Sequence, residues 1–328
     1  MKERVLITGA SGFIGYHLIE EALNNNLEVH AAVRKNSNID HLKKFNIQFT
    51  YPDFNNLSSL KRELLENRYD YIIHAAGVTK ARLQREYNLI NSKYVHNLAQ
   101  AVIESGIDLK KFVLMSSLAA LGPLESLKGV ISENSYANPI TRYGVSKLLG
   151  EERLKAFTSL NYTILRPTGV YGPRDKDIFI YFKQLVNGIE PYMGKAEQKL
   201  SFLYVTDLAK VTIKALYSGF QKTYNLSDGN FYDRYELSNL TKEYLNIKTI
   251  KIILPVNLVK FIARISEKYA APRNKAIVLS VDKLNELLGV NWSCDIERVT
   301  AELGFYPEYN LKAGVAATLQ WYKLNKWL

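Results

Sequence analysis

Two side chains of this sequence have the types and spacing needed to move a proton together. They are the tyrosine and the lysine of Tyr143-Gly-Val-Ser-Lys147, which stand near the start of a segment with helical periodicity. Residues four apart on a helix point the same way, so the phenol and the ammonium meet. A phenol titrates near pH ~10, and a lysine at ~5 Å in an effective dielectric of ~20 stabilises its anion by about 3 kcal/mol. The spacing therefore predicts that Tyr143 relays a proton near neutral pH with support from Lys147.

A third polar group is expected beside this pair. The apolar run at 112–115 reads as a buried strand, and Ser116 and Ser117 follow directly at its end. We expect Ser117 to hydrogen-bond a substrate oxygen and hold it against Tyr143. Because Tyr-x-x-x-Lys occurs by chance in many helices, this interpretation depends on the elements that precede it.

The glycine-rich stretch at 8–15 predicts a site for a dinucleotide. It follows the apolar run at 5–7 and opens a helical pattern, so it reads as strand, tight turn and helix start. In such a turn Gly9 permits an unusual backbone conformation, Gly12 admits a pyrophosphate, and Gly15 lets the helix pack on its strand. Free N-H groups and the helix dipole then face the phosphates. The alternative is a glycine-rich loop without a ligand. The other residues expected at the phosphates are Ser11, Phe13 and Ile14.

The end of the second strand bears on which dinucleotide is bound. The apolar run at 28–33 leads into Arg34 and Lys35, where an acidic residue would hold the ribose hydroxyls of NAD. Arginine instead accommodates a 2′-phosphate, and such a charge-assisted contact contributes roughly 1.5 to 3 kcal/mol. We therefore favour NADP(H) over NAD. The alternative is a surface arginine without a phosphate contact.

Residues at two further strand ends of the predicted sheet are expected to line the cofactor. Asp53 and Phe54 follow a third strand at 47–51, where they are placed to receive the adenine amino group and cover its ring. The small residues Ala75-Ala76-Gly77 follow a fourth strand at 71–74, at the edge of a parallel sheet where ligands lie.

Two polar residues near these strands have more local interpretations. His74 stands within an apolar run. We therefore favour the interpretation that it is a core histidine with satisfied hydrogen bonds over a catalytic role. Asn91, on the helix expected over about 83–105, is expected to bond the backbone near the active site.

Alternating strands and helices predict an α/β protein, a Rossmann-type doubly wound parallel sheet with a smaller mixed α/β C-terminal domain. We expect residues 1–172 to form the NAD(P)-binding domain, with 202–226 crossing back to it, and 173–328 to form mainly a substrate domain.

Composition narrows the function classes. The net charge of +11 comes from lysines scattered along helices, which indicates a solvated surface and no nucleic-acid groove. A single cysteine, Cys294, excludes an intrachain disulfide. No apolar stretch is long enough to cross a bilayer, so we expect a soluble, cytoplasmic protein, and no bound metal.

Taken together, these motifs resemble the extended short-chain dehydrogenase/reductase superfamily, also called the NAD-dependent epimerase/dehydratase family. The likeness also includes Arg166-Pro-Thr-Gly-Val-Tyr-Gly-Pro-Arg174, 202–209 and 303–307, and so covers nearly the whole chain. The resemblance implies that Tyr143 is the general acid/base, that Lys147 binds the nicotinamide ribose, and that Ser117 orients the reacting oxygen. It also implies cofactor contacts from Ser116 and, beside the nicotinamide ring, from Pro167, Thr168 and Val170.

Departures from the family pattern bear on the substrate. Sugar-nucleotide epimerases of the family usually have asparagine where this chain has Gly169, and arginine where it has Leu200 beside Lys199. Their basic C-terminal contact is also not evident at 281–291. Without these groups a diphosphate would lose several kcal/mol of charge-assisted bonding. The pattern looks more like the dihydroflavonol-reductase and 3-beta-hydroxysteroid-dehydrogenase branches, whose substrates are ketones or alcohols on apolar skeletons.

Three functional hypotheses follow. The first is an NADP(H)-dependent oxidoreductase acting on a ketone or aldehyde, or on the alcohol, of a bulky apolar or lipid-like substrate. The second is a nucleotide-sugar epimerase or dehydratase that recycles bound NAD(P). The third, a non-catalytic dinucleotide sensor, is disfavoured by the intact Ser117, Tyr143 and Lys147.

The C-terminal half contains one segment with a separate role to consider. In 256–269, Leu258, Val259, Ile262 and Ile265 are expected to share a helical face opposite Lys260, Arg264 and Lys268. Such a helix either packs on its own domain or rests on an anionic membrane. A closing helix over 311–328, with Trp321 and Trp327, is expected in the core, and the family resemblance allows a homodimer or a monomer.

Overall fold

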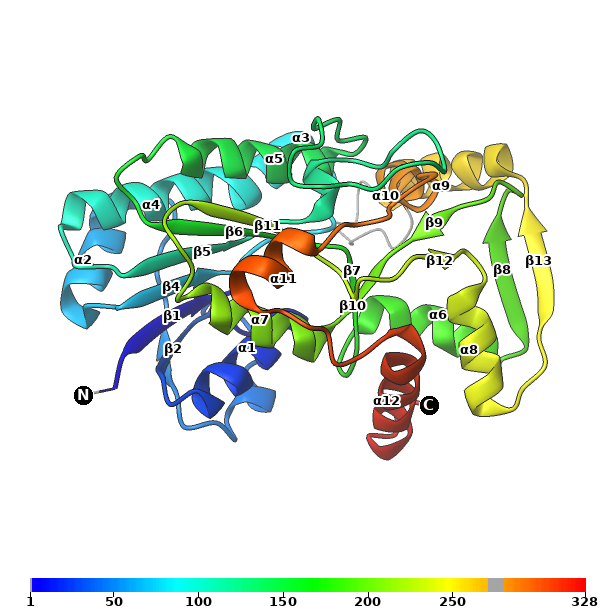
Figure 1. The fold of residues 1–328 in the computed structure, drawn as a ribbon, viewed down its shortest axis with the longest axis horizontal. Helices are drawn as coiled ribbons and strands as arrows, with labels where there is room; N and C mark the ends of the chain where they lie inside the picture. The colour runs from blue at the N-terminus through cyan, green and yellow to red at the C-terminus, as the bar shows by residue number, and fades with distance from the viewer. Residues whose placement is uncertain (1, 271–279) are drawn as a thin grey trace.

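Seven parallel strands form the central sheet of this computed structural model, which describes residues 2–270 and 280–328, with backbone alone for 266–270 (Figure 1). The strand order is β11-β6-β5-β4-β1-β2-β3. The order reverses between β1 and β4, and ligands of open parallel sheets bind at such a switch point, beyond the carboxyl ends of the strands. The strands are β1 (Arg4–Thr8), β2 (Glu28–Ala32), β3 (Gln48–Thr50), β4 (Tyr71–His74), β5 (Lys111–Met115), β6 (Tyr162–Pro167) and β11 (Lys222–Leu226).

Helices cover both faces of this sheet, which explains why its inner strands β4, β5 and β6 are buried along their whole length. In β1, Val5 and Ile7 belong to the core on one face, whereas Leu6 belongs to the core on the other. The first face is covered by α1 (Phe13–Asn24), α7 (Val205–Ala215) and α11 (Glu297–Leu303), and the second by α2 (Leu57–Asn67), α4 (Tyr94–Ser105) and α5 (Arg142–Lys155). Short helical segments occur at η1 (Asp40–Leu42), α3 (Gln84–Asn88), the π-helix η2 (Leu89–Lys93) and η3 (Leu118–Ala120).

The rest of the chain builds a smaller part beside the carboxyl edge of the sheet (Figure 1). Its two-stranded pairs are β7 (Gly169–Tyr171) with β10 (Phe202–Tyr204), β8 (Ile189–Met193) with β13 (Ile250–Leu254), and β9 (Lys199–Leu200) with β12 (Tyr232–Asp233). Its helices are α6 (Lys176–Val186), α8 (Glu236–Leu245), α9 (Val256–Ala270), α10 (Val281–Leu287) and α12 (Leu311–Leu324).

The chain returns to the central sheet twice after residue 173. Residues 202–226 supply β10, which pairs with β7, then α7 on the sheet face and β11 at its edge. The structure adds a second return, since Val299 of α11 and Phe305 are buried in the core beneath α1 and α7. The last helix, α12, buries Leu311, Val315 and Tyr322. The rings of Trp321 and Trp327 pack on Tyr322, as expected for a closing helix in the core.

The face predicted for α9 was wrong in one respect. Val259 turns into the domain, where it and Ala263 are buried against Met193, Leu254 and Leu284. In contrast, Leu258, Ile262 and Ile265 remain exposed. The side chain of Lys268 lies outside the described residues. Among the helices described, none is both long and apolar enough to span a bilayer.

Candidate active site

The loop between β1 and α1 forms a cradle of glycines. At Gly9 and Gly15 the neighbouring backbone leaves no room for a side chain. Gly9 has a φ of +69°, and a Cβ there would lie 2.7 Å from the carbonyl oxygen of Ala75. A Cβ on Gly15 would lie 2.3 Å from the carbonyl oxygen of Gly9. Gly12 caps α1 without a side chain, so the first amide groups of the helix have no side-chain acceptor. These residues fit the pyrophosphate of a dinucleotide, because the N-H groups and the helix dipole favour an anion there.

The end of β4 is held against this cradle by Thr8. The Thr8 hydroxyl accepts a hydrogen bond from the amide of Ala76 at 3.0 Å and contacts Nδ1 of His74 at 3.0 Å. Burial, with the charge of Lys147, lowers the pKa of His74 to about 3, so this histidine is neutral. The expectation of a core histidine is confirmed, although its Nε2 has no partner among the described residues.

Tyr143 and Lys147 lie one turn apart on α5. Thr141 caps this helix, because its hydroxyl accepts a hydrogen bond from the amide of Gly144 at 3.0 Å. The Lys147 ammonium is 5.9 Å from the centre of the Tyr143 ring and donates to the carbonyl of Met115 at 2.8 Å. Burial lowers the pKa of Lys147 to about 8. A Cβ on Gly77 would lie 3.2 Å from its Nζ, so the glycine keeps open the space beside the ammonium.

The surroundings of the Tyr143 phenol favour its protonated form. Burial and the charge of Glu286 raise its pKa, while a hydrogen bond from Ser117 opposes them. Ser117 stands at the end of β5, where it caps η3 by accepting the amide of Ala119 at 3.2 Å. The predicted trio of Ser117, Tyr143 and Lys147 is therefore brought together.

A π-helix places Asn91 behind this trio. Its Oδ1 accepts the amide of Val78 at 2.9 Å, and its Nδ2 donates to the carbonyl of Val78 and to the hydroxyl of Ser146. The expected backbone bond from Asn91 is confirmed. Extra turns of this kind often occur at functional sites, and here the turn fixes the loop after β4 against α5.

A buried ion pair supports the same helix from below. Arg166 on β6 donates to Glu151 on α5 through Nε at 2.9 Å and Nη2 at 2.6 Å. Ser116 donates to the same carboxylate at 2.5 Å. The Ser116 side chain is therefore directed to this pair and not to a cofactor, while the negative charge of Glu151 favours the charged form of Lys147.

The segment after β6 begins at the carboxyl edge of the central sheet. Pro167 is buried at the end of β6, and the Thr168 amide donates to Leu226 at 2.9 Å. The Thr168 hydroxyl has no partner within the described structure, and Val170 pairs with Leu203 of β10.

Helix α10 covers the other side of Tyr143. Asp282 accepts hydrogen bonds from the amide of Arg142 at 2.7 Å and from that of Tyr143 at 3.4 Å, so it caps the start of α5. Glu286, one turn later, is paired with Lys283 at 2.6 Å. Sequence reasoning missed these carboxylates, because nothing in the local pattern connects residues about 140 apart along the chain.

A polar pocket of about 490 Å³ lies beside the glycine loop at the end of β2. It brings Arg34 and Ser11 together, as the cofactor prediction requires, and adds a group of residues that the sequence analysis missed: Asn36, Ser37, Asn38, Asp40, His41 and Lys176. Asp40 is neutralised by Lys43 at 2.6 Å. Asn36 and Ser37 could have been predicted, because they directly follow Arg34 in the sequence. Lys176 comes from α6, and no sequence pattern connects it with Arg34.

Three residues predicted at the adenosine end lie outside this pocket. Lys35 is exposed and is not among the lining residues. Asp53 is exposed and accepts the amide of Asn55. Phe54 stacks on Tyr94, with ring centres 5.3 Å apart, so that face of the ring is not available to adenine.

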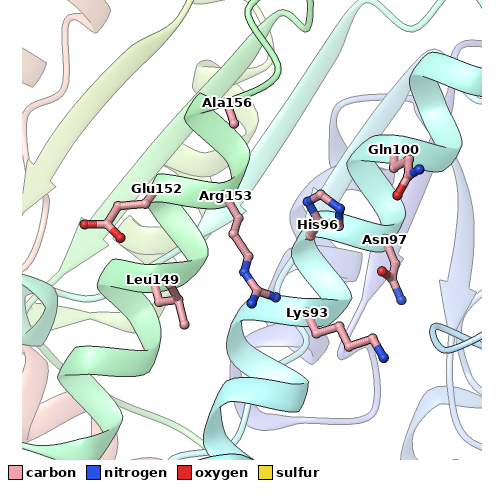
Figure 2. A pocket seen from close by; sticks show the side chains of 8 residues that line it. All are labelled: Lys93, His96, Asn97, Gln100, Leu149, Glu152, Arg153 and Ala156. Atoms are coloured by element: carbon pink, nitrogen blue, oxygen red, sulfur yellow. The ribbon is translucent and has the colours of Figure 1, made fainter.

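A larger groove, of about 720 Å³, lies between α4 and α5 (Figure 2). Its α5 residues include Leu149 and Arg153, which occupy the helix face opposite Lys147 and Glu151. The groove is therefore separate from the catalytic trio.

With this geometry established, comparison with known proteins decides the family. The model of the NAD dependent epimerase/dehydratase family matches residues 5–227. The chain belongs to this family. It is an oxidoreductase of the extended short-chain dehydrogenase/reductase type, and its fold class and enzyme class are as the sequence predicted.

Relatives in this family have different activities. The chain is 24% identical to ceramide reductase of Caulobacter vibrioides, covering 99% of this chain and 96% of that protein. It is 26% identical to N-acetyl-alpha-D-glucosaminyl-diphospho-ditrans,octacis-undecaprenol 4-epimerase of Escherichia coli O157:H7, covering 98% and 96%.

Solved structures share the fold of the whole chain. UDP-glucuronic acid 4-epimerase from Bacillus cereus, in complex with UDP-glucuronic acid and NAD, has a TM-score of 0.78 at 23% identity, covering 98% of this chain and 99% of that one. A nicotinamide cofactor fits the family and the glycine cradle. The narrower likeness to the dihydroflavonol-reductase branch stays a prediction.

Proposed function

We propose that this enzyme uses NADP(H) to reduce a ketone or aldehyde on a bulky, apolar, lipid-like substrate, and oxidises the alcohol in reverse. The observation that carries this proposal is the chemistry of α10 beside Tyr143. It presents Asp282 and Glu286, and Lys283, the only basic residue of 281–291, is already paired with Glu286. A diphosphate would meet carboxylates there, which favours a neutral substrate.

Two other departures support a neutral substrate. Gly169 pairs with Phe202 in the β7–β10 ladder and offers no side chain. Leu200 pairs with Tyr232 in the β9–β12 ladder, where sugar-nucleotide epimerases carry arginine. Neither side chain supplies a hydrogen-bond donor to a diphosphate.

The pocket beside Ser11 supports NADP(H) over NAD. Arg34 and Lys176 are cations, and the only acid in its lining, Asp40, is already paired with Lys43. A 2′-phosphate is a dianion that such a pocket can bind through charge-assisted hydrogen bonds.

The residues of the chain divide the work of reduction between them. When bound, the nicotinamide supplies a hydride. The Tyr143 phenol, whose pKa is raised by burial, is protonated at neutral pH and gives its proton to the carbonyl oxygen. The Ser117 hydroxyl orients that oxygen, and the Lys147 ammonium stabilises the phenolate that remains.

The lipid-like character of the substrate is supported by relatives. Ceramide reductase is named for a lipid, and the Escherichia coli epimerase for an undecaprenol-linked sugar. The second name also favours an alternative function, an epimerase that recycles its bound cofactor.

A carbonyl panel with added NADPH separates the two functions. We expect net loss of NADPH absorbance with lipid, steroid or other large apolar ketones, and much less with small aliphatic ones. Tyr143→Phe should abolish turnover. Turnover of a sugar nucleotide or lipid-linked sugar without net NADPH oxidation would contradict the reductase and support the epimerase.

A further inference from the structure

β13 and α9 lie at one end of the C-terminal part of the molecule (Figure 1), and both carry exposed apolar side chains. The large apolar side chains of this area have exposed fractions between 40% and 75%. We call this area the α9–β13 surface, and it consists of Ile189 of β8, Ile250 and Ile252 of β13, and Leu258, Phe261, Ile262 and Ile265 of α9.

The strand residues and the helix residues adjoin one another. In the parallel pair β8–β13, Ile250 lies opposite Ile189 and Leu254 opposite Met193, so all four share one sheet face. The Met193 and Leu254 end of this face is covered by the buried side of α9. The exposed end of the sheet and the outer side of α9 therefore form one apolar area.

The charges on this segment all have one sign. Residues 248–265 contain four basic residues and no aspartate or glutamate. In the described part of the chain, none of the four takes part in an ion pair. They are Lys248, Lys251, Lys260 and Arg264.

We propose that the α9–β13 surface rests on an anionic lipid membrane. Seven large apolar side chains exposed next to one another mark an interaction site. Lys260 and Arg264 of α9 place positive charge beside the apolar area, whereas Lys251 lies on the other sheet face over the ring of Tyr235. The positive charge of α9 matches the negative potential of a lipid surface, which attracts basic groups while apolar side chains enter the headgroup region.

The α9–β13 surface is connected through α10 to α5, the helix that carries Tyr143 and Lys147. Leu284 of α10 packs on Val259 and Ala263 of α9, and Asp282 of the same short helix caps α5 at Arg142. If the enzyme rests on a membrane through the α9–β13 surface, the α10 side of its active site lies near the bilayer. The proposal does not depend on which substrate the enzyme turns over.

Cosedimentation of the full chain with vesicles tests the proposal. We expect binding at low salt to vesicles made of equal parts phosphatidylglycerol and phosphatidylcholine, weak binding to phosphatidylcholine alone, and loss of binding at high salt. Phe261→Ser should weaken binding about tenfold, and Arg264→Gln about fivefold.

Matched variants elsewhere on the surface serve as controls. Phe220 is 56% exposed against 59% for Phe261, so Phe220→Ser should bind as the parent does. Arg62→Gln, on exposed α2, should also have no effect. Absence of binding to the mixed vesicles at low salt would overturn the proposal, as would equal loss in the control variants. It would also be overturned if Phe261→Ser converted a dimer into a monomer without vesicles, because the surface would then bind a second copy.

Discussion

Lys147→Met should raise the pKa of Tyr143 by about two. The ammonium lies 5.9 Å from the centre of the phenol ring. At an effective dielectric of ~20, that separation corresponds to about 3 kcal/mol of phenolate stabilisation. In the oxidation direction, where Tyr143 acts as the base, kcat/KM near neutral pH should fall about a hundredfold, and its acidic limb should move to higher pH.

The titration of Lys147 itself supplies a second readout. Its pKa of about 8 lies below the ordinary 10.5, so the folded state is penalised for the charge below pH 8. Between about 8 and 10.5 the unfolded chain binds more protons, and the free energy of unfolding from this group rises with pH. Lys147→Met should lack this rise and should keep the parent thermal stability, because it removes a buried charge.

The assay is the pH profile of kcat/KM for alcohol oxidation, measured with the product of the best ketone in the panel. Lys155→Met is the control, since Lys155 lies on the same helix with 43% of its side chain exposed. If Lys147→Met kept the parent profile, or if Lys155→Met shifted the profile equally, the electrostatic reasoning would be refuted.

Further predictions concern the cofactor loop and one buried acid. Arg34→Ala should reduce the preference for NADPH over NADH about ten- to hundredfold in binding titrations, and equal parent affinities for both would contradict the phosphate assignment. Gly9→Ala should abolish cofactor binding, whereas Gly106→Ala, with a similar φ of +66° but no atom near its Cβ, should cost stability alone in thermal melts. Burial raises the pKa of Asp175 to about 6, so its stabilising contribution is present below pH ~4 and is lost as pH rises through 6. Asp175→Asn should flatten that part of the stability curve in urea titrations, and an unchanged curve would count against the raised pKa.

Sequence reasoning was most reliable where chemistry follows from local order. The strands that carry Thr8, His74 and Ser117 are recognisable as apolar runs because helices cover both faces of the sheet. The pair Tyr143 and Lys147 needs only a helix to meet. Motif order therefore predicted the fold and the meeting of Ser117, Tyr143 and Lys147, whose catalytic roles stay a prediction.

Contacts between distant segments were not predictable in the same way. The bond from the Arg142 amide to Asp282 joins residues 140 apart, and Lys176 reaches the Arg34 pocket from α6. The stacking of Phe54 on Tyr94 was not indicated by the local sequence either, and its contact with adenine stays a prediction. Periodicity also could not tell which side of α9 packs, since Val259 and Leu258 are both apolar neighbours.

The cap that Asp282 places on α5 bears on the order of assembly during synthesis. A growing chain can form β1 to β6 and the glycine cradle well before residue 282 leaves the ribosome. The amide of Arg142 receives its acceptor only after that point. The glycine cradle should thus form earlier during synthesis than the capped start of α5 that carries Tyr143.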